Sequence, residues 1–242
     1  MANQIQSCFQ RYEKKYRLTR AQQEFLLHAM RPYLEADRYG QYTICNIYYD
    51  TDDWHLIRTS LEKPVYKEKL RVRSYGVPGD NDPVFVELKK KYDGVVYKRR
   101  ITTEAHTAAQ LLAGQIPGST FGQIGREIGW FQSVHQTAPK AFIGYDRLAF
   151  AGIENSDLRI TFDTNLRWRT TETDLRQGSH GALILPEDEV LMEIKIPGAA
   201  PLWLSHLLTE ADAFSSSFSK YGYCFQHHIA PNLNRKKALS CA

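Results

Sequence analysis

The sequence predicts an α+β fold built on an antiparallel β-tunnel, a closed barrel of about eight strands with a charged lumen and helices packed outside. Several segments alternate apolar and polar residues with the period of two that is typical of a strand. Two of these segments flank Asp93-Gly94, a pair that is typical of a tight hairpin turn. Few long crossovers separate the strands, and helices able to cover their apolar faces are present, so an antiparallel barrel is the simplest arrangement.

The predicted elements run in order from a first helix to a C-terminal tail. Thr19 and Gln22 form a capping-box pattern, which predicts a helix that ends or kinks at Pro32. Strands are predicted at residues 43–49, 65–75, 83–92, 95–103, 139–151, 157–169 and 188–196. Residues 50–53 are predicted to lead into a short helix that runs through Leu61, and further helices are predicted at residues 104–113, 121–135 and 201–211, before a tail at 215–229. No linker or repeat divides the chain, so we expect a single domain over residues 1–242.

Length and composition exclude several classes of protein. The 242 residues suffice for one large core, and a net charge of +4 is too small for a basic coat, so no nucleic-acid partner is expected. No apolar run approaches the roughly 20 residues that span a bilayer. The first residues also lack the pattern of a secretion signal. We therefore expect a cytoplasmic protein without a transmembrane segment.

Residue types that often bind metals show no recognisable zinc motif. The cysteines are Cys8, Cys45, Cys224 and Cys241. Because they form no C-x-x-C pair, a zinc site or a disulfide framework is not expected. The adjacent His227 and His228 would point to opposite faces of a strand. Asp50, Asp52 and Asp53 precede a predicted helix, where capping and favourable dipole interactions explain them more simply than metal binding.

Basic residues gather on one face of the predicted strands. The alternating charged set comprises Lys67, Lys69, Arg71 and Arg73, then Glu87, Lys89 and Lys91, then Arg159, Thr161, Asp163, Asn165, Arg167 and Arg169, and finally Glu193 and Lys195. A half-solvated sheet shows the same alternation and is the alternative to a barrel. The excess of Lys and Arg favours a lumen, because a solvent face tends to mix both signs of charge with neutral residues.

The predicted hairpin also places like charges opposite each other. With a two-residue turn at 93–94, counting back along both strands pairs Lys89 with Lys98 and Glu87 with Arg100. Like charges directly opposite on a sheet are destabilising. The pattern therefore suggests that an anion lies between the two lysines.

Such a lumen suits the chemistry of phosphates. Guanidinium groups bind phosphate oxygens in bidentate fashion, and ammonium groups act as compact point charges. Carboxylates such as Glu193 and Glu13 would hold a divalent cation that bridges phosphate oxygens. Phosphoryl transfer requires mainly positioning and charge neutralisation, without a dedicated protein nucleophile. The chain has no G-x-x-x-x-G-K-[ST] or G-x-G-x-x-G motif, so side chains rather than a glycine loop would hold the phosphates.

Seven segments, taken in order, carry a resemblance to a known family. They are residues 11–16 (RYEKKY), 69–76 (KLRVRSYG), 84–89 (VFVELK), 145–150 (YDRLAF), 159–166 (RITFDTNL), 191–195 (LMEIK) and 218–221 (FSKY). Together they resemble the VTC domain, the polyphosphate polymerase branch of the CYTH-like triphosphate tunnel metalloenzymes. The resemblance covers nearly the whole chain.

The resemblance implies an enzyme that transfers the γ-phosphate of ATP to a growing polyphosphate chain, with Mn²⁺ or Mg²⁺ bound. ATP and polyphosphate are then its partners. By motif match, the phosphate-binding and catalytic residues are Lys15, Arg71, Arg73, Lys89, Arg147 and Lys220. Glu193 binds the metal, with Glu13 as the second carboxylate. Further phosphate-binding residues in the lumen, with less defined roles, are Lys69, Lys98, Arg159 and Lys195.

The chain departs from the family pattern at two places. Arg11 stands where the wider superfamily has a glutamate, which favours a single-metal, polymerase-like site. Ser217 stands where the eukaryotic polymerase has a second lysine, so one phosphate contact is missing. Without the regulatory SPX domain and the membrane helices of the eukaryotic protein, the chain resembles a stand-alone prokaryotic type.

Two other functions are compatible with these residues. One is a hydrolase of tripolyphosphate or nucleoside triphosphates in the same tunnel, and the other is a non-catalytic module that binds a polyanion. Glu193 argues against pure binding, because a binder gains little from a buried carboxylate without a metal. We also expect Arg71→Ala and Lys89→Ala to leave the fold intact, since removing a lumen cation relieves repulsion.

Overall fold

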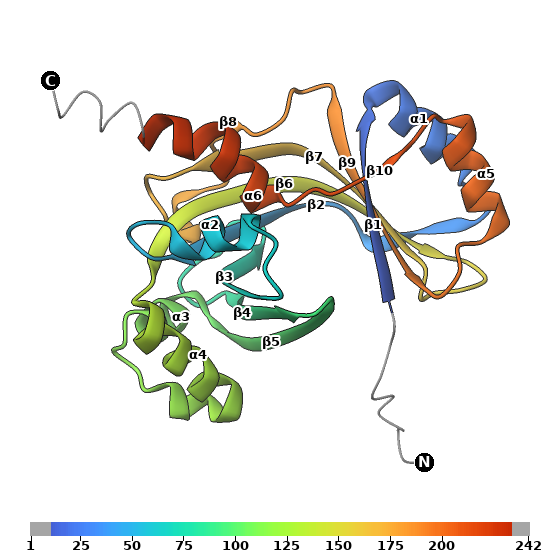
Figure 1. Ribbon diagram of the computed structural model, residues 1–242. Helices are drawn as coiled ribbons and strands as arrows, with labels where there is room; N and C mark the ends of the chain where they lie inside the picture. Colours follow the sequence, from blue (N-terminus) through green and yellow to red (C-terminus); the bar gives the residue numbers. More distant parts are fainter. Residues whose placement is uncertain (1–10, 234–242) are drawn as a thin grey trace, which may run out of the picture. The chain divides into compact units, whose positions relative to one another are not determined.

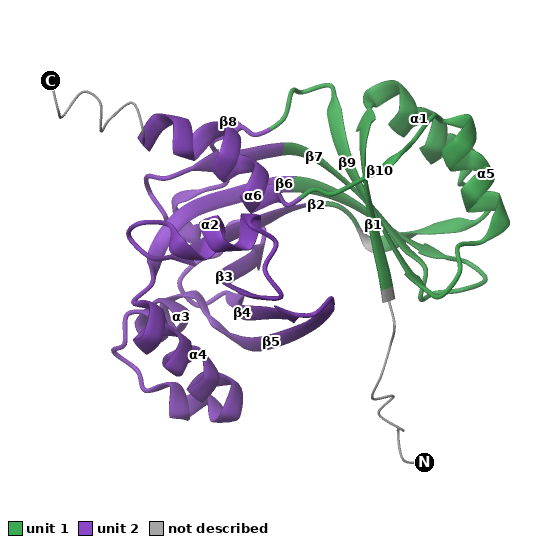
Figure 2. Cartoon of the chain, in the orientation of Figure 1, with its two compact units in different colours: residues 1–42, 146–165, 185–218 green, residues 43–145, 166–184, 219–242 purple. Residues whose placement is uncertain are grey.

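The computed structural model describes residues 11–233, in which the chain forms two compact units (Figures 1 and 2). Unit 1 contains residues 1–42, 146–165 and 185–218, and unit 2 contains residues 43–145, 166–184 and 219–242. The unit boundaries fall within β2 (Leu34–Asp50), β6 (Ala138–Gly152) and β7 (Arg159–Arg169), so each of these strands contributes to both units.

Unit 1 begins with the helix start that the capping pattern predicted. The Gln22 N–H donates to Thr19 Oγ1 at 3.2 Å, and the Thr19 N–H donates to Gln22 Oε1 at 2.8 Å. The capped helix is α1 (Arg20–Ala29). The other elements of this unit are β1 (Arg11–Thr19), β9 (Glu189–Pro197), α5 (Leu202–Glu210), β10 (Ser215–Ser216) and the adjoining parts of β2, β6 and β7.

The helices of unit 1 cover one face of its strands (Figure 2). Buried residues at even positions of β1, β7 and β9 pack with residues from α1 and α5, as the period of two requires. Ile160, Phe162 and Ile194 are at most 1% exposed, and they share this core with Leu26 of α1 and Leu204 of α5. The odd positions of the same strands carry the charged residues.

Unit 2 has the same division into an apolar and a charged face. Its elements are α2 (His55–Leu61), β3 (Tyr66–Tyr75), β4 (Pro83–Tyr92), β5 (Val95–Glu104), α3 (Ala105–Leu112), η1 (Gly118–Phe121), α4 (Gly122–His135), η2 (Leu175–Gln177), β8 (Ala182–Leu183), α6 (Lys220–Cys224) and the π-helical η3 (Phe225–Ile229). Leu70, Val86 and Leu88 are fully buried in one cluster with Leu111 of α3 and Phe131 of α4. The helices therefore cover the apolar face of β3–β5.

The β4–β5 hairpin has the predicted register. Asp93 and Gly94 have φ of +43° and +82°, the left-handed pair that a type I′ turn requires. Lys89 pairs with Lys98 and Glu87 pairs with Arg100, as expected. The opposition of like charges inferred from the sequence is thus present in the fold.

The strands form one 10-stranded sheet in the order β10-β1-β9-β7-β6-β2-β3-β4-β5, with β8 paired to β7. Every strand pair whose register is resolved within residues 11–233 is antiparallel. The fold class is therefore α+β with a large antiparallel sheet. Among the residues that the structure describes, hydrogen bonds do not join the two end strands of this order, so closure of about eight strands into a barrel stays a prediction.

The structure corrects two predictions about elements. The strand expected at 43–49 is the second half of the longer β2, which begins at Leu34. His227 and His228 lie in η3 rather than on a strand, and the His228 ring nitrogen Nε2 lies 2.9 Å from the Ile184 carbonyl oxygen. Cys8 and Cys241 lie outside the described residues. Within residues 11–233, no helix is long and apolar enough to cross a membrane.

Candidate functional site

A cationic face covers one side of β3–β5 in unit 2. Strand register places Lys69 opposite Lys89, and Lys89 opposite Lys98, so three lysines cross the sheet in one row, the lysine row. The adjacent row on the same side places Arg71 opposite Glu87. We call this surface the unit 2 cationic face; it consists of Lys69, Arg71, Arg73, Lys89, Lys98 and Arg100 around Glu87.

Glu87 is the anionic centre of this face. Its side chain is 1% exposed and forms ion pairs with Arg71 Nη2 at 2.7 Å, with Lys98 Nζ at 3.3 Å and with the Arg100 guanidinium. Burial raises the pKa of Glu87, but attraction to Arg71, Arg73 and Lys98 and hydrogen bonding from Arg100 together hold it well below the usual range. The carboxylate is therefore ionised and already engaged by several cations.

Polar groups fix the arginines of β3 in place. Arg71 Nη1 donates to the buried Tyr48 hydroxyl at 3.1 Å. Arg73 Nε donates to Asn46 Oδ1 at 2.9 Å, and Arg73 Nη2 donates to the Tyr145 hydroxyl at 3.3 Å. Burial raises the pKa of Tyr48, but the combined fields of Arg71, Arg73 and Lys69 outweigh it, so the pKa is lowered. These contacts orient both guanidinium groups without neutralising their charge.

The C-terminal segment of unit 2 places Lys220 near the residues that contact the β3 cations. Ser219 caps α6 by accepting a hydrogen bond from the Gly222 N–H at 3.2 Å, and its hydroxyl also accepts from Lys69 Nζ at 3.3 Å. Lys220 Nζ lies 4.5 Å from the centre of the Tyr145 ring, whose hydroxyl accepts from Arg73. Lys220 and the β3 cations thus share partners, although they are far apart in sequence.

A second charged face lies on the odd positions of β1, β7 and β9 in unit 1. Thr161 lies opposite Glu193, and Glu193 lies opposite Lys15. In the next row, Lys195 lies between Arg159 and Glu13. We call this surface the unit 1 charged face; it consists of Glu13, Lys15, Arg159, Thr161, Glu193 and Lys195.

The two predicted metal-binding carboxylates both lie on the unit 1 charged face. Glu193 Oε1 lies 2.8 Å from Lys195 Nζ, and Glu13 Oε1 lies 3.3 Å from Lys15 Nζ. Lys15 Nζ also donates to the Phe218 carbonyl at 3.0 Å. Within residues 11–233, no group of three or more His, Cys, Asp and Glu side chains is arranged to hold a metal. The two carboxylates are diagonal neighbours on adjacent strands, a separation that long side chains can bridge.

Arg147 and Arg169 both make contacts within the protein that the sequence did not predict. Arg147 donates to the fully buried Asp163 through Nε at 2.6 Å and Nη2 at 2.8 Å, a bidentate pair in unit 1. The alternation along β7 breaks at Asn165, which has a φ of +49°. Arg169 was expected on the charged face, but its guanidinium lies 3.8 Å from the Phe142 ring of the unit 2 core. The Arg169 prediction is therefore wrong, whereas a phosphate contact for Arg147 stays a prediction.

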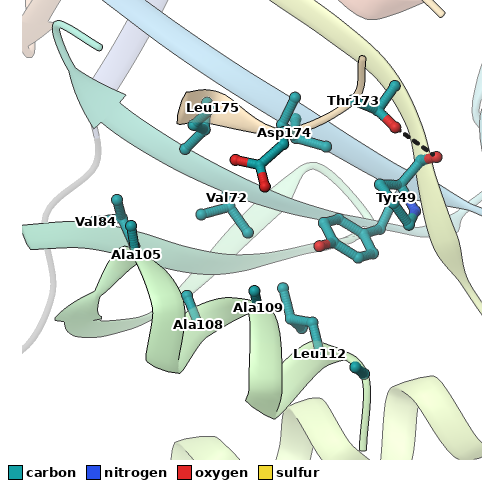
Figure 3. Close-up of a pocket in the computed structure, with 13 residues that line it drawn as sticks. Tyr49, Val72, Val84, Ala105, Ala108, Ala109, Leu112, Thr173, Asp174 and Leu175 are labelled. Atoms are coloured by element: carbon teal, nitrogen blue, oxygen red, sulfur yellow. Dashed lines mark hydrogen bonds between the residues drawn. The ribbon is translucent and has the colours of Figure 1, made fainter. Parts of the chain in front are cut away.

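A separate pocket of about 240 Å³ lies on the apolar side of unit 2, between α3 and the sheet (Figure 3). Ile47, Tyr49, Val72 and Val84 line it, on the side of the strands opposite the unit 2 cationic face. Burial and the nearby Asp174 carboxylate raise the pKa of Tyr49 to about 12. The pocket is therefore chemically distinct from the charged faces.

The sequence did not indicate the roles of several residues in or beside the unit 2 cationic face. Tyr48 is buried and stacks on Tyr221, and its hydroxyl also accepts a hydrogen bond from Arg71. Arg100 was noted only as a partner of Glu87. Tyr145 lies within a family motif, but only the neighbouring Arg147 was assigned a role. Strand alternation and the register counted from the hairpin turn could have placed Arg100 on this face. The roles of Tyr48 and Tyr145 follow only from long-range contacts.

Unit 2 thus presents a face rich in ammonium and guanidinium groups around one buried carboxylate, whereas unit 1 presents a face of mixed charge. Residues 10–228 match the VTC domain family, and the chain belongs to this family. A comparison with curated protein sequences finds no match.

The solved structures of similar fold include two candidate cyclases. A candidate adenylate cyclase from Bacillus halodurans has a TM-score of 0.53 and 13% identity over 86% of this chain and 92% of that protein. A candidate adenylyl cyclase from Hippeastrum, described as having a dominant triphosphatase activity, has a TM-score of 0.51 and 17% identity over 88% of this chain and 94% of that protein. With the family match, these folds support the CYTH-like tunnel superfamily indicated by the motifs.

Proposed function

We propose that the protein is a metal-dependent phosphotransferase that moves the γ-phosphate of ATP to a growing polyphosphate chain, within a closed tunnel. The observation that carries this proposal is the lysine row beside Arg71 and Arg100 on the unit 2 cationic face. Opposed lysines repel one another, Glu87 already balances part of this charge through Lys98, and a phosphate chain would supply further closely spaced negative charges. Membership of the VTC domain family supports the same conclusion.

The residues of unit 2 would bind and orient phosphates. Arg71 and Arg73 are fixed by Tyr48, Asn46 and Tyr145, so their remaining N–H groups are held ready for phosphate oxygens. The lysine row and Lys220 would add point charges that neutralise the charge developing on a transferred phosphoryl group. Positioning and neutralisation are the main requirements of this reaction, so these side chains supply much of the catalysis.

The residues of unit 1 fit a divalent cation. Carboxylate oxygens of Glu193 and Glu13 are the hard ligands that Mg²⁺ and Mn²⁺ prefer, and each already holds an ammonium group near it. When bound, the cation would neutralise negative charge on the phosphate oxygens. Lys15, Lys195 and Arg159 would contact the phosphates beside it, and Arg147 is assigned a phosphate contact by its motif.

A triphosphatase is the second candidate. The triphosphatase activity described for the Hippeastrum protein of similar fold supports this possibility. Incubation of the pure protein with ATP and Mn²⁺, followed for ADP, free phosphate and polyphosphate, separates the two. Polyphosphate that accumulates with ADP is expected for the polymerase, whereas free phosphate alone would make the protein a hydrolase.

Glu193→Ala separates both enzymes from a module that only binds polyanions. Either enzyme should lose turnover, because the variant lacks a metal ligand, while a binding module should hold polyphosphate at least as well as before. Glu154→Ala, at an exposed loop position of the same unit, is the matched control. An inactive wild type that binds polyphosphate, with Glu193→Ala binding equally well, would contradict the enzyme proposal.

A further inference from the structure

The hydroxyl of Thr161 is an anomaly on the unit 1 charged face. Thr161 Oγ1 is buried and has no hydrogen-bond partner in the part of the chain that the structure describes. Thr161 on β7 lies directly opposite Glu193 on β9. Directly opposed residues project to the same side of a sheet, with Cβ atoms about 5 Å apart. The side chain of Thr161 therefore lies beside that of Glu193, a predicted metal ligand.

A buried hydroxyl without a partner is costly, because it has lost its hydrogen bonds to water without replacing them. Valine has nearly the same shape and would avoid this cost. Thr164 on the same strand shows the ordinary arrangement, since its hydroxyl donates to the Asp146 carbonyl at 3.4 Å. The contrast suggests that the partner of Thr161 is a group that arrives from outside the chain.

The neighbouring charges indicate what this group is. Glu193 lies 2.8 Å from the Lys195 ammonium, and Glu13 lies 3.3 Å from the Lys15 ammonium, so both carboxylates already interact with positive charge. A hydroxyl and two carboxylates together form an all-oxygen donor set, which suits hard divalent cations. An anion is a poorer match, because it would lie beside the Glu193 carboxylate.

We propose that Thr161 Oγ1 is a third oxygen donor for the divalent cation assigned to Glu193 and Glu13. This inference rests on the proposed function, since it concerns the same cation. It accounts for the unpartnered hydroxyl, and it adds a neutral oxygen donor to the two carboxylates. Thr161 then favours metal binding at the expense of the stability of the metal-free protein.

Mn²⁺ binding to the full chain, followed by electron paramagnetic resonance of the free ion, tests the inference. Thr161→Val should weaken Mn²⁺ binding about tenfold or more, by analogy with other residues that support a metal site. Thr161→Ser restores the oxygen and should keep the affinity of the wild type. Thr164→Val, which removes a partnered hydroxyl from the same strand, should also keep it.

Thermal unfolding without metal is the second measurement. Thr161→Val should unfold at a temperature no lower than the wild type, because no hydrogen bond is lost, whereas Thr164→Val should unfold at a lower temperature. If Thr161→Val binds Mn²⁺ as tightly as the wild type, or is destabilised as much as Thr164→Val, the inference is wrong. If the wild type binds no Mn²⁺, or Glu193→Ala binds it equally well, the metal assignment itself fails and the inference with it.

Discussion

Glu87 on β4 and Arg71 on β3 lie directly opposite each other and form an ion pair of 2.7 Å between Oε2 and Nη2. The Glu87 side chain is 1% exposed, and the Lys98 and Arg100 side chains also contact it. A single buried carboxylate therefore balances part of the repulsion among the cations that we propose bind phosphates. Its removal should affect stability and ligand binding in opposite directions.

Glu87→Gln should lower the free energy of unfolding by about 3 kcal/mol, because breaking a buried ion pair leaves its partners uncompensated. Denaturant titration of the wild type and the variant measures this loss. Glu154→Gln is the control, since Glu154 is exposed. Inorganic tripolyphosphate should restore more stability to Glu87→Gln than to the wild type, because the added anion replaces the missing charge. Equal stability of the two glutamine variants would refute the role of Glu87.

Stability should also depend on pH through Glu87. Its pKa in the folded chain is held below the ordinary value of 4.5, so the group stabilises the fold above that pH. As the pH falls below about 4.5, the unfolded chain takes up this proton first and the contribution declines. The free energy of unfolding of the wild type should therefore fall more steeply between pH 5 and 3 than that of Glu87→Gln. Parallel pH profiles would show that Glu87 titrates normally.

Lys89→Ala should lower the rate of catalysis while leaving the stability of the fold nearly unchanged. Lys89 is the exposed middle member of the lysine row, so its loss should change stability by only about 0.5 kcal/mol. We expect turnover to fall about 100-fold, as when one group that stabilises transition-state charge is removed. Lys14→Ala, at an exposed even position of β1, is the control for a lost positive charge. Full activity of Lys89→Ala would remove Lys89 from the phosphate-binding set.

Arg71→Ala should behave differently from Lys89→Ala. From the sequence alone, both variants were expected to keep their fold. The ion pair with Glu87 changes this expectation for Arg71, because its removal leaves a buried carboxylate with weaker compensation. A lower unfolding temperature for Arg71→Ala than for Lys89→Ala is the expected result, and the reverse order would contradict it.

Tyr221→Phe tests how α6 holds Lys220. The Tyr221 hydroxyl donates to Asp50 Oδ2 at 2.9 Å, and Asp50 also accepts from the N–H groups of Leu56 and Ile57 at the start of α2. Loss of this hydrogen bond should cost about 1 kcal/mol and loosen the helix that begins at Lys220. We expect a higher KM for ATP with a smaller change in kcat. Tyr223→Phe on the same helix is the control, and an equal effect of both changes would exclude a specific role of the Asp50 contact.

Much of the fold follows from local patterns in the sequence. The period of two assigned β3, β4 and β5 to within a residue, and the turn at Asp93-Gly94 fixed the pairing of Lys89 with Lys98. The Thr19 capping box located the start of α1. These features depend on neighbouring residues, so they can be predicted without the rest of the chain.

Other features required the folded chain. The alternation along β7 predicted the wrong face for Arg169, because the left-handed Asn165 interrupts it. The pairing of Arg71 with Glu87 depends on the register across the loop between β3 and β4, whose length does not fix that register. Lys220 meets the β3 cations only because Tyr145 and Ser219 bridge segments distant in sequence.

The sequence by itself determined the antiparallel strands, their apolar and charged faces, and the family motifs that name the candidate phosphate-binding residues. Only the tertiary structure decided which charges are compensated, with Glu87 held by several cations and Arg147 held by Asp163. It also revealed the unpartnered hydroxyl of Thr161 beside Glu193. The physical reason is that side-chain alternation is a local property of the chain, whereas ion pairs and buried polar groups depend on contacts between strands brought together by folding.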